Sequence, residues 1–218
     1  MRTTSPNKLK HRPDQKWDTG DILLPDELAE TPLDFATMFP DRPARPVEME
    51  IGCGKGTFLL GRATFRPELN YVGIEYARPY AEHCSDRFRR HGLDNIRMFA
   101  TDAGLVVKHT PDESLLRLHI YYPDPWPKRR HQRRRLIQPA FLDEVRRILV
   151  PGGQLLLVTD HRDYFEHMLE VIADAPGFAR CEFPRLLAED VHTVGTNFET
   201  KYIEEGRSVH KAALLKYI

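Results

Sequence analysis

A short stretch near the middle of the chain joins one carboxylate to a dense run of cations. Residues 121–135 read YYPDPWPKRRHQRRR, and Asp124 stands between Pro123 and Pro125. Proline fixes its own φ and restricts the residue before it, so this carboxylate is held in a restrained turn. A polyanion could dock on the cations and present one group to the carboxylate for chemistry. Taken alone, however, the run of cations is also typical of a solvated surface.

Further carboxylates stand at the ends of predicted strands. Glu50 and Glu75 each end such a strand, and Asp102 closely follows another. Ligands of open α/β sheets bind at the edge where the parallel strands have their carboxyl ends. Glu75 could there accept hydrogen bonds from a ribose diol, and Glu50 or Asp102 from an ammonium or an adenine amino group. Each acid alone could be a solvated charge, but their succession at strand ends favours a ligand site.

The turn after the first of these strands reads Gly52-Cys53-Gly54-Lys55-Gly56. Glycines allow a backbone to turn tightly and to approach a ligand closely. The spacing matches neither the dinucleotide fingerprint G-x-G-x-x-G nor the P-loop, which also needs a Ser or Thr after its lysine. A row of acids suits a cationic cofactor better than a polyphosphate. S-adenosylmethionine, which carries a sulfonium, an ammonium and a ribose diol, is such a cofactor.

The elements that must position these residues alternate between strands and helices. Strands are predicted at 47–51, 71–75, 95–100, 116–122, 154–159, about 178–183 and about 208–217, and helices from 57, at 79–91, at 134–149 and at 164–173. This alternation predicts an α/β fold with a doubly wound, mainly parallel seven-stranded sheet. Residues 1–45 are predicted to be a basic, proline-rich arm and lead-in, and residues 46–218 the folded domain.

The composition limits the possible class of protein but does not indicate a binding partner. The chain has 218 residues, which favours one large domain, and its Lys+Arg and Asp+Glu counts are both 32. Its 3 cysteines are too scattered for a disulfide framework or a zinc site, and we expect no metal. No apolar run is long enough for a membrane span or a signal peptide. We therefore expect a cytoplasmic protein with reduced thiols.

Four motifs together carry a family resemblance. Residues 50–56 resemble motif I of class I methyltransferases. Combined with PDPWPKRRH at 123–131, VTD at 158–160 and TNFE at 196–199, they make the chain resemble the bacterial tRNA (guanine-N7-)-methyltransferase, or TrmB, family. The resemblance covers roughly residues 46–216. It implies a Rossmann-like fold and methyl transfer from S-adenosylmethionine to N7 of a tRNA guanine, the one at position 46 of the variable loop.

The resemblance also implies residue roles. Asp124 would be the catalytic residue, between methyl donor and guanine. Cofactor contacts are implied for Glu50, Gly52, Gly54, Gly56, Glu75, Asp102, Ala103 and Asp124. Substrate contacts are implied for Lys128, Asp160, Thr196, Asn197, Phe198 and Glu199. RNA contacts are implied for Arg129, Arg130, His131, Arg133, Arg134 and Arg135. The product would be S-adenosylhomocysteine. The sequence leaves the oligomeric state open between a monomer and a homodimer.

Several alternatives stay open at this level. The chain could methylate a small molecule or a protein, or it could be a non-catalytic RNA-binding protein that kept the fold. Trp126 could stack on the target base or be buried beneath the loop. The basic arm over residues 1–20 could add phosphate contacts or be inert.

Overall fold

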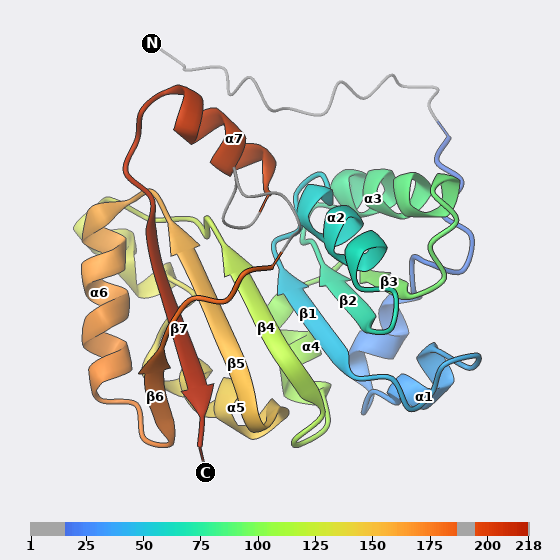
Figure 1. The fold of residues 1–218 in the computed structure, drawn as a ribbon, viewed down its shortest axis with the longest axis horizontal. Coiled ribbons are helices and arrows are strands. Elements are labelled where there is room, and N and C mark those ends of the chain that lie inside the picture. Colours follow the sequence, from blue (N-terminus) through green and yellow to red (C-terminus); the bar gives the residue numbers. More distant parts are fainter. Residues whose placement is uncertain (1–15, 187–194, 218) are drawn as a thin grey trace.

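A computed structural model of the chain describes residues 16–186 and 195–217. Its centre is a seven-stranded sheet in the order β3-β2-β1-β4-β5-β7-β6 (Figure 1). The strands are β1 (Val47–Ile51), β2 (Asn70–Ile74), β3 (Ile96–Phe99), β4 (Leu115–Tyr121), β5 (Leu149–Thr159), β6 (Phe178–Cys181) and β7 (His210–Lys216). Neighbours from β3 to β5 are parallel, and β7 is antiparallel to both β5 and β6. The predicted mainly parallel, doubly wound sheet is confirmed.

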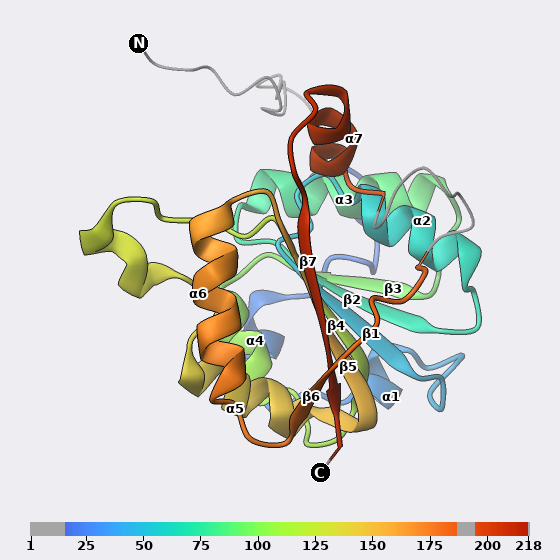
Figure 2. The same cartoon turned by 60° about the vertical axis from the view of Figure 1, so that its left-hand side comes forward.

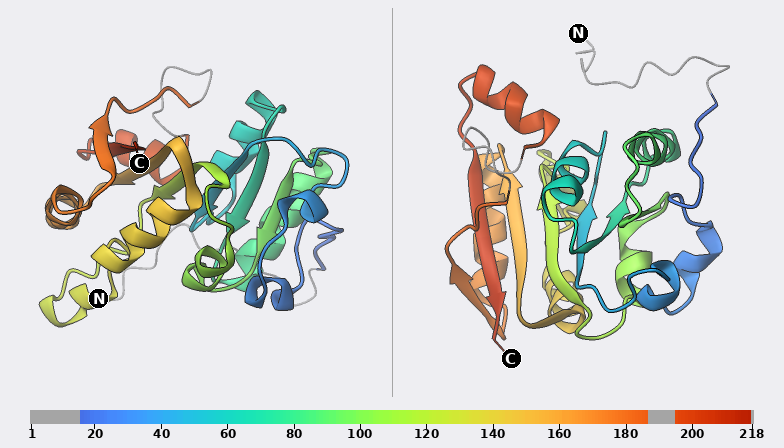
Figure 3. Two further views of the ribbon diagram at one scale, coloured as in Figure 1. Left: turned by 90° about the horizontal axis from the view of Figure 1, so that it is seen from below. Right: turned by 45° about the vertical axis from the view of Figure 1, so that its right-hand side comes forward.

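Helices cover both faces of the sheet (Figures 2 and 3). The α-helices are α1 (Phe35–Met38), α2 (Thr57–Phe65), α3 (Arg78–Arg90), α4 (Ala103–His109), α5 (Pro139–Ile148), α6 (Arg162–Ala173) and α7 (Asn197–Glu204), and the 3-10 helices are η1 (Asp26–Glu30) and η2 (Arg129–Arg134). One apolar core lies under α2 and α3, and a second lies under α4, α5 and α6. The lead-in closes the outer edge of β3, because Leu24 N donates to Met98 O and Met98 N donates to Ile22 O.

The predicted helix over 134–149 is wrong at its start. The basic residues form η2 instead, and α5 begins only at Pro139, the first residue of its first turn. Proline has no N–H and its ring clashes with the preceding turn, so the helix cannot extend back through this position. The predicted strand at 154–159 also begins earlier, at Leu149. A register shift in its pairing with β4 accommodates the Pro-Gly-Gly segment inside β5.

Two helices beyond the lead-in were not predicted, and both begin at polar caps. The Asp102 side chain accepts a hydrogen bond from Gly104 N and caps α4. At α7, Thr196 Oγ1 accepts from Glu199 N at 3.0 Å, and Glu199 Oε2 accepts from Gly195 N at 2.7 Å. Thr196 and Glu199 occupy the T-x-x-E positions of a helix start, with the Glu199 carboxylate accepting from Gly195, one residue before the N-cap. The segment predicted to be irregular therefore holds a helix.

A buried network of charges lies beneath the carboxyl edge of β1. Glu48 on β1 is fully buried and receives hydrogen bonds from Arg62 Nε at 3.0 Å and Nη2 at 2.9 Å. Arg117 on β4 adds an ion pair at 2.8 Å. His119 lies between Glu48 and Tyr121, with Nε2 3.1 Å from Oε2 and Nδ1 2.7 Å from the phenol oxygen. Burial lowers the pKa of His119, and a neutral ring protonated on Nε2 satisfies both contacts.

The same network ties a distant segment to the core. Arg62 Nη1 donates to Leu186 O at 2.6 Å, across 124 residues of sequence. Leu186 belongs to the segment after β6, which runs across the face of the sheet toward α2 (Figure 1). Burial alone would raise the pKa of Glu48, but its hydrogen bonds to His119 and Arg62 outweigh burial and hold that pKa well below its usual value.

We expect Glu48→Gln to lower the free energy of unfolding by about 3–5 kcal/mol, because it leaves the buried Arg62 without its counter-charge. Urea denaturation at pH 7 measures this loss. Glu166→Gln is the matched control, since Glu166 pairs with Arg162 at an exposed site and should change the same quantity by less than about 1 kcal/mol. Equal effects of the two substitutions would contradict a stabilising role for the buried network.

Candidate active site

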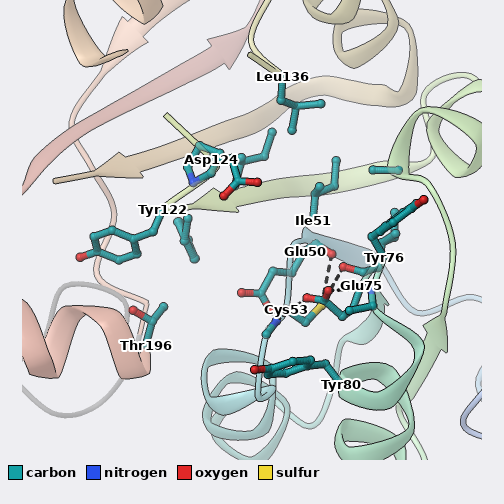
Figure 4. A pocket seen from close by; sticks show the side chains of 18 of the residues that line it. Glu50, Ile51, Cys53, Glu75, Tyr76, Tyr80, Tyr122, Asp124, Leu136 and Thr196 are labelled. Carbon is teal, nitrogen blue, oxygen red and sulfur yellow. Dashed lines mark hydrogen bonds between the residues drawn. The ribbon is translucent and has the colours of Figure 1, made fainter. Parts of the chain in front are cut away.

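A cavity of about 530 Å³ opens at the carboxyl edge of β1, β2 and β4. The four predicted carboxylates Glu50, Glu75, Asp102 and Asp124 all line it. In Figure 4, Glu50 and Glu75 stand beside each other, and Asp124 stands above them at the end of β4. Because parallel strands end at one edge, the topology brings together acids that lie far apart in the sequence.

The glycine turn forms the floor of this cavity beside Glu75. Gly54 has φ of 55°, and its N–H donates to Glu75 Oε2 at 2.8 Å, while Ala77 N donates to Oε1 at 3.0 Å. Both oxygens of Glu75 are therefore fixed by backbone donors. Gly56, by contrast, does not line the cavity. A Cβ there would lie 2.6 Å from Phe88 Cζ, so this glycine is required for packing against α3.

Glu50 is the cavity acid with a buried oxygen that lacks a hydrogen-bond partner within the described residues. Its side chain is buried, and the oxygen concerned is Oε2. Burial raises the pKa of Glu50 to about 8, and the negative charge of Glu75 adds to this, although a hydrogen bond with Cys53 opposes it. A buried carboxylate with one unpartnered oxygen favours a cation in the space in front of it.

Backbone strain flanks Asp124. Tyr122 has φ of 52° and Trp126 has φ of 44°, both in the left-handed region that residues other than glycine rarely adopt. Such positions cost on the order of 1–3 kcal/mol each and persist where surrounding contacts hold them. Here Tyr122 N donates to Val158 O at 2.7 Å, and Arg135 Nε donates to Pro125 O at 3.0 Å. The backbone that carries Asp124 is thus held in place at the cavity.

Arg135 differs from the other cations of the basic run. It is almost fully buried, its guanidinium lies 4.9 Å from the Tyr164 ring centre, and Nη2 pairs with Asp163. The expectation that Arg135 contacts RNA is therefore corrected: its side chain holds the Asp124 loop against α6. The exposed cations are Lys128, Arg129, Arg130, Arg133 and Arg134, and all but Lys128 belong to η2.

Trp126 is not buried beneath the loop, and the predicted stacking on the target base stays a prediction. Its side chain is half-buried and lines the cavity, so it is not sealed under the loop. One face of its ring is covered by the Arg134 guanidinium, 5.1 Å from the ring centre, and His131 meets its edge at 5.9 Å. Stacking of a base on that face would require Arg134 to move away.

The opposite side of the site is only partly built from the predicted substrate residues. Thr196 and Phe198 line the cavity, and the Phe198 ring lies 5.9 Å from that of Tyr122. Asp160 instead pairs with Arg207 at 3.1 Å, and Glu199 serves the start of α7. Lys128 is exposed outside the cavity, and the side chain of Asn197 lies outside the described part of the chain.

Sequence reasoning missed an aromatic part of the lining. Tyr76, Tyr80 and Tyr122 line the cavity, and Tyr76 is 78% exposed. Tyr76 directly follows Glu75, so its position after a strand-end acid was a signal that could have been used. Within residues 16–186 and 195–217, no group of His, Cys, Asp and Glu side chains could hold a metal ion. Nor is any described helix long and apolar enough to cross a membrane.

Comparisons with known proteins agree on one family. Residues 44–212 match a family described as a putative methyltransferase. The chain is 43% identical to the tRNA (guanine-N(7)-)-methyltransferase of Halorhodospira halophila, over 77% of this chain and 73% of that relative. It is 37% identical to the protein of the same name from Pseudomonas aeruginosa, over 90% of this chain and 79% of that one.

Solved structures share the fold at low sequence identity. The 16S rRNA methyltransferase KamB has a TM-score of 0.58 at 16% identity, with 84% of this chain and 93% of that chain covered. TrmN from Thermus thermophilus has a TM-score of 0.55 at 20% identity, with 81% and 46% covered. Their likeness shows a class I methyltransferase fold and nothing finer.

We predict that Glu50 makes the ligand-free protein less stable as the pH rises. The pKa of this carboxyl is about 8 in the folded protein, against a usual value of 4.5. Its stabilising contribution is therefore complete below about pH 4.5 and lost as the pH rises through 8, by up to about 1.4 kcal/mol per pH unit. Urea denaturation of wild type and Glu50→Gln between pH 5 and 9 should show the advantage of the variant growing with pH. A constant difference would contradict the raised pKa.

Proposed function

The chain belongs to the tRNA (guanine-N7-)-methyltransferase family, and we propose that it transfers a methyl group from S-adenosylmethionine to N7 of a guanine in tRNA. One observation carries the proposal: four carboxylates converge on a cavity whose rim bears a cationic 3-10 helix. The carboxylates suit a cationic methyl donor, and the cations suit RNA phosphates. The guanine of the variable loop is the proposed target, and a tRNA substrate places the reaction in the cytoplasm.

The cavity fits the cofactor in volume and in donor set. Its volume of about 530 Å³ lies within the range usual for small-molecule sites. The unpartnered Glu50 Oε2 would face the ammonium, Glu75 would accept from the ribose hydroxyls, and Asp102 with Ala103 would hold the adenine end. When bound, S-adenosylmethionine supplies an electrophilic methyl group on its sulfonium.

Asp124 is suited to orient the nucleophile rather than to remove a proton. Guanine N7 has an in-plane lone pair and carries no hydrogen, so its attack needs alignment and no general base. Alignment can supply much of the reduction in barrier, up to about 7–11 kcal/mol. The Asp124 carboxylate would accept hydrogen bonds from the guanine N1–H and amino group, which fixes the ring. Its negative charge would also stabilise the positive charge that develops on the base.

Base and cofactor must meet outside the RNA stack, so the target guanine has to leave its neighbours. Phe198 offers a ring at the cavity that is 39% exposed, on which such a base could stack for about 1–3 kcal/mol. The Trp126 ring is already covered on one face by Arg134. We therefore assign base stacking to Phe198, with Trp126 as part of the wall beside the catalytic loop.

The cations of η2 provide the proposed RNA surface. Arg129, Arg130 and Arg133 are exposed, and none of them forms an ion pair with an acid in the described part of the chain. Unpaired cations next to the catalytic loop would place tRNA phosphates beside Asp124. A small-molecule or protein substrate would leave these cations without a role. A non-catalytic RNA-binding protein would have no need of Glu50, Glu75 and Asp124 in one cavity.

We expect Asp124→Asn to lower the single-turnover rate of tRNA methylation by about 100-fold or more, because an amide cannot carry the charge that stabilises the methylated base. Single-turnover assays with unmodified tRNA and labelled S-adenosylmethionine, followed by nucleoside mapping, measure this. Asp174→Asn, at the far end of α6, is the control and should retain wild-type turnover. If the Asp124→Asn variant loses cofactor affinity but keeps the single-turnover rate at saturating cofactor, Asp124 binds the cofactor without a catalytic role.

Replacing Arg129, Arg130 and Arg133 together by glutamine should weaken tRNA binding and make it less sensitive to salt. The slope of log K against log salt concentration should become shallower by about 1 for each arginine that contacts a phosphate. Filter binding at a series of salt concentrations from about 50 to about 300 mM gives the slope, and Arg180→Gln on the exposed strand β6 serves as the control. An unchanged slope in the triple variant would exclude η2 from the RNA surface.

A further inference from the structure

The charged residues that line the cavity are mainly acids, yet the proposed cofactor carries an anionic group as well. Its methionyl group bears an ammonium and a carboxylate on the same carbon atom. A carboxylate placed among Glu50, Glu75 and Asp124 would be repelled unless a cation met it. Among the described residues that line the cavity, Lys55 and Arg134 are the ones with a permanent or near-permanent positive charge.

Arg134 already has a partner within the protein. Its guanidinium covers the Trp126 ring at 5.1 Å, on the side of the cavity where the basic helix η2 lies. Lys55 belongs to the glycine turn that follows β1, the strand that also carries Glu50. Its ammonium makes no hydrogen bond or ion pair with any described residue, and the side chain is half-buried at the cavity.

The backbone around Lys55 is fixed from both sides. Arg87 Nη1 donates to Lys55 O at 2.9 Å and to Thr57 Oγ1 at 3.2 Å. Gly54 N on the preceding residue donates to Glu75, as described above. The lysine therefore extends from a backbone that is already ordered, so binding a ligand does not have to order the turn as well.

The start of α2 adds donors at the same place. Its N-cap is Gly56, which has no side chain to cap the helix, so the first N–H groups of α2 receive no side-chain cap. A helix N-terminus carries a partial positive charge and favours a carboxylate. Lys55 directly precedes this cap, so a cation and uncapped backbone donors occur together at one turn.

We propose that Lys55, with the first turn of α2, binds the methionyl carboxylate of S-adenosylmethionine, while Glu50 binds the ammonium. One turn then matches both charges of the zwitterion with opposite charges. The assignment rests on the proposed function, because it presumes that this cofactor occupies the cavity. It also implies selectivity: a derivative that lacks the carboxylate binds more weakly, because Lys55 finds no partner.

The test is a cycle that removes the lysine charge and the ligand carboxylate separately. Titration calorimetry gives Kd for S-adenosylmethionine and for its decarboxylated derivative, with wild type, Lys55→Met and Lys55→Arg. For the methionine variant we expect Kd of S-adenosylmethionine to rise by about tenfold, equivalent to about 1.4 kcal/mol, and Kd of the decarboxylated ligand to change by less than about twofold. The arginine variant should retain most of the wild-type affinity. Lys108→Met, an exposed lysine on α4, controls for the loss of one charge.

The outcomes separate this assignment from the proposed function. Equal losses for both ligands, or no loss for either, overturn the role of Lys55 while the wild-type protein still binds cofactor and methylates tRNA. A loss of tRNA affinity in Lys55→Met with unchanged cofactor Kd would instead assign the lysine to an RNA phosphate. Failure of the wild-type protein to bind S-adenosylmethionine at all would overturn the proposed function together with this inference.

Discussion

The site depends on the buried carboxylate of Glu48. Its partners come from α2 and β4, and one of them, Arg62, also holds Leu186 from the segment that crosses the sheet. A carboxylate this deeply buried is tolerable only when permanent cations and hydrogen bonds satisfy it. Those requirements fix β1, β4 and α2 relative to one another directly below the cavity. The position of the cavity floor that carries Glu50 is therefore determined by the ion pairs and hydrogen bonds of Glu48 as well as by apolar packing.

Above that floor, the site combines rigid and unsatisfied groups. Glu75 is held by two backbone N–H groups, and the Asp124 loop is held in a strained conformation by Val158 and the buried Arg135. Glu50 remains without a partner for one oxygen among the described residues. Groups that orient a ligand, such as Glu75 and Asp124, must be fixed before the ligand arrives. A group that attracts the charge of the ligand, such as Glu50, gains most when it has no partner beforehand.

The fold and the four carboxylates that line the cavity could be predicted from the sequence. Both follow from local patterns and from the rule that ligands bind at the carboxyl edge of parallel strands. Sequence reasoning misjudged residues whose role is decided by tertiary contacts. Nothing within the basic run distinguishes Arg135 from its neighbours, and only the fold shows it facing Tyr164 and Asp163. Gly56 likewise looked like a ligand glycine, but α3 packs against it. The helix after Thr196 could have been predicted, because the T-x-x-E pattern of a helix start is visible in the sequence.

Residues 22–24 of the lead-in cover the outer edge of β3, and this limits where the protein can be truncated. Residues 22–24 supply hydrogen bonds to Met98, and Leu33 and Phe39 belong to the same apolar core as α4 and α5. A truncation that starts at the first strand of the sheet, near residue 46, would remove this cover and leave the outer edge of β3 unpaired, although β3 would still pair with β2. Open strand edges template self-association. An excised catalytic core is therefore a candidate for aggregation, and the smallest useful expression fragment must begin ahead of Ile22.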